Sequence, residues 1–209
     1  MFGLHKSLLW ERLNFIIPSI LTIIAFIVSI FLFLLPRVHE ISIEQKKNAI
    51  KELVSLPLQV CSSLAQKADS GDITQDEARR RARELIRDLN YGSEGKDYFW
   101  IIDTRPFMIL HPYRHDLEGK DVSDYRDKNG TFVFKRMVEI SKEQGSGFVT
   151  YNWQIRDEAE EIGKKLSYVS TFDPWNWIIG TGLYLGEVER EIDRITGSML
   201  WVSLAVTLG

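Results

Sequence analysis

Side chains that could hold a small anion are concentrated between residues 98 and 168 of this chain. They combine aromatic rings, hydroxyl and ring N–H donors, and cations. A small anion needs an apolar wall that excludes water and a few fixed hydrogen-bond donors. Tyr, Trp and His can supply both, and a lysine can neutralise a carboxylate. The candidate ligand-binding residues are Tyr98, Trp100, His111, Arg114, Tyr151, Lys165 and Tyr168.

The period of a β-strand indicates which of these side chains can meet. Successive side chains point to opposite faces of a sheet, so Tyr98, Trp100 and Ile102 are expected on one face. Tyr151 and Trp153 are expected to align in the same way on a later strand. Ordinary core packing is the alternative role for Tyr98 and Trp100.

Lys165 and Tyr168 have opposite parity, so both can face one ligand only if a bulge or bend intervenes. We expect Lys165 to form the ion pair with the ligand and Tyr168 to donate its hydroxyl. His111 is expected to share a face with Ile109 and is held extended by Pro112. The alternatives are a solvent-facing edge lysine for Lys165 and a structural hydrogen bond for His111.

Other kinds of site fit the sequence less well. His111, His115 and Asp116 could hold a metal on a helix, but Pro112 and the strand-to-loop pattern argue against a helix there. The acidic residues between 121 and 129 lack the EF-hand pattern. The sequence contains no G-x-S-x-G, no H-E-x-x-H and no P-loop. We therefore expect no catalytic residue, no metal and no cofactor, and a domain that is not an enzyme.

Helices come first in the chain and strands follow. Apolar residues recur at helical spacing from Val38 to Ala68, and Thr74 with Glu77 forms a capping box for a second helix that ends near Asn90. Strands are expected at 97–103, 107–111, 147–154, 164–172 and 175–184, with an amphipathic helix at 131–144. This order predicts an α+β domain with an antiparallel sheet of about five strands and one inserted helix.

The second helix carries five arginines among acidic residues. Their spacing predicts i,i+4 ion pairs, such as Glu77 with Arg81 and Arg80 with Glu84, on a solvated face. A site for an anion or a lipid headgroup is the alternative for this segment.

Apolar segments lie on both sides of this polar region. Phe15 to Leu35 has no charged residue and would cover about 31 Å as a helix, against ~30 Å for the hydrocarbon of a bilayer. We expect a cytoplasmic N-terminus at 1–14, a transmembrane helix at 15–36, an extracytoplasmic domain at 37–196 and the truncated start of a second transmembrane helix at 197–209. A cleaved signal peptide is the competing account, but the apolar core is too long and no A-x-A site follows it. The flanking charges do not settle the orientation.

Composition limits the partners. The formal net charge is −3, so nucleic acid is not expected. The single cysteine, Cys61, excludes an intramolecular disulfide. The long helix from Val38 to Ala68 is the expected interface of a homodimer.

The strand half contains a series of short motifs. They are GKDYFWIID (95–103), MILHP (108–112), EGKD (118–121), DKNG (127–130), GFVTYNWQ (147–154), KLSYV (165–169) and WNWIIGTGLYL (175–185). In order and spacing they resemble the single-Cache family of extracytoplasmic sensor domains, which have a PAS-like sheet beside a long N-terminal helix. The two flanking apolar segments fit this resemblance.

The resemblance implies a domain that senses small molecules, often short organic acids, and feeds a histidine kinase, a chemoreceptor or a nucleotide cyclase. We therefore expect the input part of an inner-membrane receptor, with residues 37–196 in the periplasm. Its expected partners are a short organic acid, the lipid bilayer and a second copy of the chain. Any enzyme would belong to an output module beyond residue 209. The alternative is a membrane-anchored structural or interaction domain without a small-molecule ligand.

Overall fold

The computed structural model describes residues 17–92, 94–156 and 158–208. The chain divides into two compact units. Gln45–Val188 forms one of them, and the segments Met1–Glu44 and Glu189–Gly209 group into the other. All of the candidate ligand-binding residues belong to the unit Gln45–Val188.

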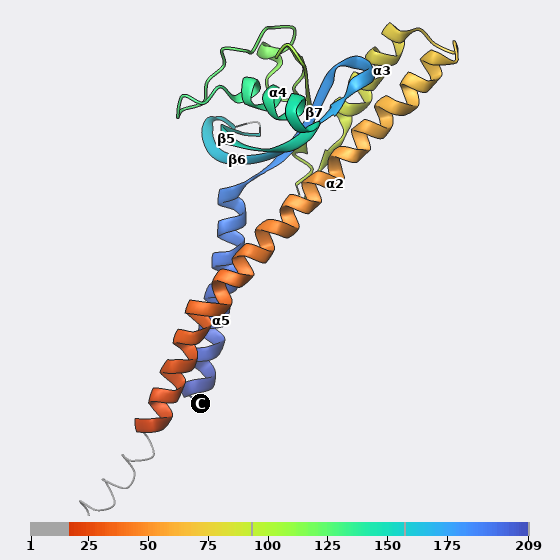
Figure 1. Ribbon diagram of the computed structural model, residues 1–209. Coiled ribbons are helices and arrows are strands. Elements are labelled where there is room, and N and C mark those ends of the chain that lie inside the picture. The colour runs from red at the N-terminus through yellow and green to blue at the C-terminus, as the bar shows by residue number, and fades with distance from the viewer. Residues whose placement is uncertain (1–16, 93, 157, 209) are drawn as a thin grey trace, which may run out of the picture. The chain divides into compact units, whose positions relative to one another are not determined.

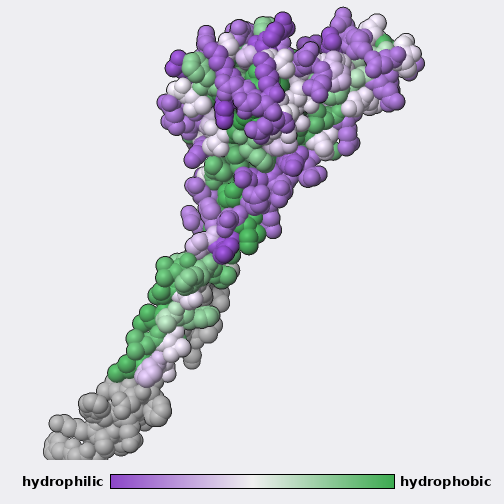
Figure 2. All heavy atoms as spheres, in the orientation of Figure 1, coloured by the Kyte–Doolittle hydropathy of each residue, from purple (hydrophilic) through white to green (hydrophobic). Residues whose placement is uncertain are grey.

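The chain is helical from Ile17 to Asp69, with the π-helical segment η1 (Ile30–Leu34) leading into α2 (Leu35–Asp69). Among the described residues, this is the one helix that is long and apolar enough to cross a membrane, judged by length and composition. Its first part carries a mostly hydrophobic surface (Figure 2). The expected N-terminus at 1–14 and the first two residues of the expected span lie outside the described residues.

The C-terminal helix α5 (Leu185–Leu208) follows the last strand directly. It includes most of the apolar segment 197–209 in one continuous helix, while Gly209 lies outside the described residues.

The second helix, α3 (Gln75–Asp88), begins as the sequence predicts. The Thr74 hydroxyl oxygen accepts a hydrogen bond from the Glu77 amide at 3.2 Å, which caps the helix. The predicted ion pairs of Glu77 with Arg81 and of Arg80 with Glu84 are both confirmed.

The strands form one antiparallel five-stranded sheet in the order β4-β3-β7-β6-β5. A short ladder of β1 (Asn90–Tyr91) with β2 (Asp97–Tyr98) precedes it. The other elements are β3 (Trp100–Asp103), β4 (Met108–Leu110), η2 (His115–Leu117), α4 (Val133–Gln144), β5 (Ser146–Ile155), β6 (Glu158–Phe172), η3 (Asp173–Trp175) and β7 (Trp177–Tyr184). The predicted α+β fold, with about five strands and an inserted helix, is confirmed.

The last strand begins two residues later than predicted. Trp175 ends the 3-10 turn η3, and Asn176 adopts a left-handed conformation with φ of 51° before Trp177 opens β7. Pro174 lies within this turn and has no N–H to donate to a strand ladder, so residues 173–175 form the turn and the strand begins only at Trp177.

Helices cover both faces of the sheet (Figure 1). α4 packs on one face through apolar residues such as Phe134 and Met137. α2 and α3 pack on the other face, where α2 contributes Cys61 and α3 contributes Ala82 and Ile86. The sheet therefore has two buried faces, and the face on which each candidate residue lies decides what it can contact.

Candidate functional site

The first two candidate residues lie on the α4 face of the sheet. Tyr98 ends β2 and Trp100 begins β3, and both belong to the apolar cluster beneath α4. Phe99 and Ile101 belong instead to the cluster against α2 and α3. The alternation predicted for this segment is therefore confirmed.

Lys165 is buried on the same face of the sheet and brings a positive charge to it. It lies in β6 opposite Tyr151 of β5 and Tyr184 of β7, and it is 1 % exposed. Its Nζ donates a hydrogen bond of 2.9 Å to the Tyr98 hydroxyl. The same atom lies 4.0 Å from the centre of the Tyr98 ring and 5.0 Å from that of Tyr184. Lys165 is therefore not the solvent-facing edge residue of the alternative prediction.

The Tyr98 phenol is protonated in this environment. Burial is the largest cause that raises its pKa well above the ordinary value. Its hydroxyl can therefore act as a hydrogen-bond donor to an anion at neutral pH.

His111 lies just after β4, is 2 % exposed, and turns toward the α4 face. Its ring centre is 5.0 Å from that of Tyr98 and 5.4 Å from that of Trp153. The expected shared face with Ile109 is wrong, since Ile109 packs against the α2 and α3 cluster. Strand alternation does not carry over to His111 because β4 ends at Leu110, and the pairing of β3 with β4 already shifts register within the strand.

The hydrogen bonds of His111 define its proton state. Its Nδ1 accepts from the backbone amides of Tyr113 at 3.3 Å and Arg114 at 3.0 Å. Burial, followed by the charges of Lys165 and Arg114, lowers the pKa of His111 well below its ordinary value. The imidazole is therefore neutral, and its proton is on Nε2, which can donate a hydrogen bond.

Trp153 lies at the centre of the aromatic contacts. Its ring centres are 5.2 to 5.8 Å from those of His111, Tyr125, Phe134 and Tyr151. The predicted alignment of Tyr151 and Trp153 is confirmed, since both belong to the cluster under α4. The indole N–H of Trp153 is buried and makes no close hydrogen bond within the part of the chain that the structure describes, although it approaches the Tyr98 hydroxyl and acts to lower the pKa of that phenol. A buried donor that is incompletely satisfied is costly, so this N–H marks a place where a ligand oxygen could bind.

Arg114 lies at the edge of these rings. Its guanidinium carbon is 5.7 Å from the ring centre of Tyr125 and 5.8 Å from that of Trp153. The side chain is 22 % exposed and makes a two-pronged ion pair with Asp116, with N–O distances of 2.7 and 2.8 Å. The hydrogen bonds to Asp116 raise the pKa of Arg114 above its ordinary value. Its charge is thus partly balanced before any ligand binds.

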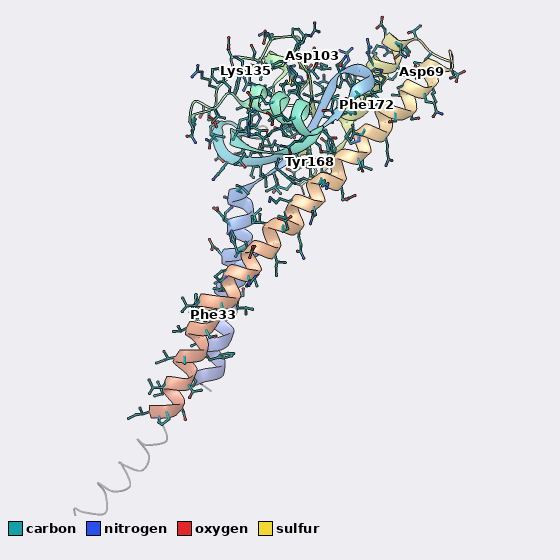
Figure 3. The ribbon with its side chains drawn as sticks, viewed as in Figure 1. Phe33, Asp69, Asp103, Lys135, Tyr168 and Phe172 are labelled. Atoms are coloured by element: carbon teal, nitrogen blue, oxygen red, sulfur yellow. The ribbon has the colours of Figure 1, made fainter. Side chains whose placement is uncertain are left out.

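Tyr168 is not brought to the other candidates. Its hydroxyl donates to the Ser146 hydroxyl at 2.9 Å, and its ring packs on Phe148 and in a cluster with Ile50 and Val54 of α2. It lies on the α2 side of the sheet (Figure 3). Lys165 and Tyr168 therefore lie on opposite faces of the sheet, because β6 pairs with β7 in regular register between them and no bulge intervenes.

We call Tyr98, His111, Tyr151, Trp153 and Lys165 the buried polar cluster. Trp100 packs beneath the same helix as this cluster, and Arg114 lies at its edge. Trp153 was not among the candidate residues, although its alternation with Tyr151 is the signal that could have identified it. Tyr113 and Tyr125, which pack against the same face from the loop before α4, carry no such signal because loops have no period.

Two open clefts lie elsewhere in this unit. One of about 520 Å³ is formed by α4 and β5, and its walls include Phe132, Lys135 and Thr150. The other, of about 460 Å³, is lined by α3, the turn after β3 and the start of β7. Neither cleft has a member of the buried polar cluster in its wall.

Comparison with known proteins identifies relatives of this architecture. Residues 42–197 match the family described as Single Cache domain 2. The methyl-accepting chemotaxis protein McpP of Pseudomonas putida is 31 % identical over 185 residues, which cover 88 % of this chain and 34 % of that protein. The sensor histidine kinase MctS of Rhizobium johnstonii is 31 % identical over 146 residues, which cover 70 % of this chain and 30 % of that protein. The chain thus spans about a third of the length of these curated relatives.

A solved structure shares both the fold and the sequence pattern. It is a Cache chemosensory domain described in terms of carboxylic acid recognition, and it is 37 % identical to this chain with a TM-score of 0.66. The match covers 70 % of this chain and 97 % of that domain. The family match over residues 42–197, together with this shared fold, shows that the chain belongs to the Single Cache domain 2 family of sensor domains.

Proposed function

We propose that this chain is the periplasmic input domain of an inner-membrane receptor, and that it binds a short organic carboxylate in the buried polar cluster. The receptor is a chemoreceptor or a sensor histidine kinase, as in the relatives described above. Any catalytic activity belongs to an output module outside this domain.

The observation that carries the proposal is the set of buried donors around the Tyr98 hydroxyl: the Lys165 ammonium donates to it at 2.9 Å, and the indole N–H of Trp153 is buried beside it without completing a close hydrogen bond. Trp153 faces Gly163 in the neighbouring strand, so Lys165 is its diagonal neighbour on the same face of the sheet. The neutral imidazole of His111 lies between Trp153 and Tyr98. An ammonium, an indole N–H, an imidazole N–H and a phenol thus converge, and a carboxylate supplies the negative charge and the acceptors that such a group of donors needs.

The size of the ligand limits its affinity. A two- or three-carbon acid has about four to six heavy atoms, and at a ceiling of ~1.5 kcal/mol per atom its binding free energy cannot exceed roughly 6–9 kcal/mol. Micromolar dissociation constants are therefore about the tightest that this site can reach.

The segment between β4 and α4 covers the buried polar cluster and is the candidate entry route for the ligand. Tyr113, Leu117 and Tyr125 from this segment pack against the cluster under α4. The two open clefts do not reach the cluster. We infer that this segment opens to admit the ligand and closes over it, with Arg114 at its edge.

Tyr184 provides a direct route from the cluster to α5. It is the last residue of β7, its ring lies 5.0 Å from the Lys165 ammonium, and α5 begins at the next residue. Its hydroxyl accepts a hydrogen bond from the Arg156 amide. A carboxylate that draws Lys165 toward itself changes the contact with Tyr184 and so biases the start of α5. The ligand can shift the equilibrium between the two signalling states only to the extent that it binds one state more tightly than the other.

We further propose that residues 15–36 anchor the domain in the membrane, that residues 197–209 begin a second span, and that α2 forms the interface of a homodimer. The apolar first part of the helix Ile17–Asp69 supports the anchor. Analytical ultracentrifugation of the chain in detergent tests the dimer, and a monomer at high protein concentration would contradict it.

Calorimetric titration tests the ligand class. The purified chain in detergent is titrated with acetate and propionate, and with acetamide and propionamide as neutral controls of the same shape. We expect saturable binding of the acids alone, and a dissociation constant about 2- to 10-fold weaker in Trp153→Phe, because that variant loses one hydrogen bond while keeping an aromatic ring. If no short acid binds or raises the unfolding temperature, the structural or interaction role is the better account.

A further inference from the structure

One arginine of α3, Arg79, lines a cleft that is separate from the buried polar cluster. This open cleft of about 460 Å³ lies where α3, the turn after β3 and the junction of η3 with β7 meet. Its walls include Arg79, Arg105, Trp175 and Trp177. Asp103, which is labelled in Figure 3, marks the β3 end of the cleft. The cleft lies entirely within the unit Gln45–Val188.

Arg79 differs from Arg80 and Arg81 of the same helix. Arg80 and Arg81 form close ion pairs with Glu77, whereas the nearest ion-pair contact of Arg79 is a 3.9 Å approach of its Nη1 to the exposed Asp76. The Nε atom of Arg79 is buried and has no hydrogen-bond partner among the described residues. The Arg79 side chain as a whole is 44 % exposed, so its Nη groups remain accessible, and the planar guanidinium is suited to a carboxylate or a phosphate.

The remaining groups of the cleft leave it with positive charge. The Asp103 carboxylate already accepts from the Arg105 guanidinium at 3.0 Å and from the backbone amides of Arg105 and Phe107 at 2.8 and 3.0 Å. Its charge is therefore balanced locally, and the charge of Arg79 is not balanced by it. The two tryptophans are each 5 % exposed and form a rigid wall, with ring centres 4.7 Å apart. The indole N–H of Trp175 is engaged by the side chain of Gln75 at 3.1 Å.

We propose that this cleft is a second ligand site, which binds the carboxylate or phosphate group of a small molecule through the Arg79 guanidinium. The Arg79 guanidinium holds the oxyanion, and the rings of Trp175 and Trp177 form the wall of the cleft beside it. The site requires no opening of the segment before α4, so it can fill independently of the buried polar cluster.

Calorimetric titration of the full chain in detergent with malonate and with inorganic phosphate tests the proposal. The variants are Arg79→Gln, Arg79→Lys, Arg83→Gln and Lys165→Met. Arg83 is an exposed arginine of the same helix, so Arg83→Gln removes the same charge outside the cleft. Arg79→Lys keeps the charge but loses the planar fork. Circular dichroism establishes that each variant is folded.

We expect saturable binding of malonate, phosphate or both to the natural chain, and a loss of about tenfold or more in Arg79→Gln, with a smaller loss in Arg79→Lys. Arg83→Gln and Lys165→Met should bind within about twofold of the natural chain. The two probes distinguish a carboxylate site from a phosphate site. Absence of saturable binding at millimolar concentration, or equal affinity in folded Arg79→Gln, would overturn the proposal. If Lys165→Met loses the binding instead, the measured binding heat comes from the buried polar cluster, and the proposal of a second site is overturned.

Discussion

Replacement of Lys165 by methionine gives the sharpest test of the buried polar cluster. Methionine is close to lysine in length and remains apolar, so Lys165→Met removes the ammonium with little change in packing volume. It also removes the 2.9 Å hydrogen bond to Tyr98 and the cation above the two tyrosine rings. The adjacent Lys164 is exposed on the other face of β6, so Lys164→Met is the matched control.

The expected loss follows from the burial of Lys165. A hydrogen bond to a charged group contributes about 1.5–3 kcal/mol, which corresponds to a factor of about 10 to 150 in the dissociation constant. Because the residue is only 1 % exposed, screening by solvent does not reduce this effect as it would at a surface ion pair. A micromolar propionate site would therefore become one of tens to hundreds of micromolar.

Isothermal calorimetry with propionate measures this change for the natural chain, Lys165→Met and Lys164→Met in the same detergent. Chemical denaturation of each variant without ligand shows whether the fold is retained. Lys164→Met should bind as the natural chain does. A folded Lys165→Met that binds propionate within twofold of the natural chain would refute the role of the ammonium.

Three further predictions concern other parts of the domain. His111→Asn should remove a pH dependence of stability: the natural chain should lose up to about 1.4 kcal/mol of unfolding free energy per pH unit below about 6.5, since the unfolded imidazole takes up a proton that the buried one does not. Denaturant unfolding between pH 5 and pH 7.5 measures this slope, and an unchanged slope in the variant contradicts the assignment. Tyr168→Phe should lower the unfolding free energy by about 0.5–1.5 kcal/mol through loss of the bond to Ser146, yet leave propionate affinity unchanged; weaker binding would place Tyr168 in the site after all. Gly180→Ala should cost about 1–3 kcal/mol in urea unfolding, because its Cβ would overlap the ring of Trp100, and a neutral result would show that the ring can move aside.

The sequence by itself was sufficient for the properties that depend on near neighbours along the chain. The helical period of α2, the Thr74 cap of α3 and its ion pairs involve residues a few positions apart. The alternation of Tyr98 and Trp100 follows from the two-residue period of a strand. Such interactions join residues that are close in the sequence, so the α+β class and the order of helices before strands could be predicted from it.

Only the tertiary structure decided which of these residues meet. Lys165 and Tyr98 are 67 positions apart, and their contact depends on the packing of β2 beside β7 and the pairing of β7 with β6 rather than on any local pattern. The place of His111 depends on where β4 ends, and the Arg79 cleft combines three distant segments. Tyr168 illustrates the same limit. Its hydroxyl suits a ligand, but its position in β6 places its side chain on the face of the sheet that packs against α2. The physical reason is that strand register and the packing of the two faces are set by the whole core at once, and a residue's type and spacing do not contain that information.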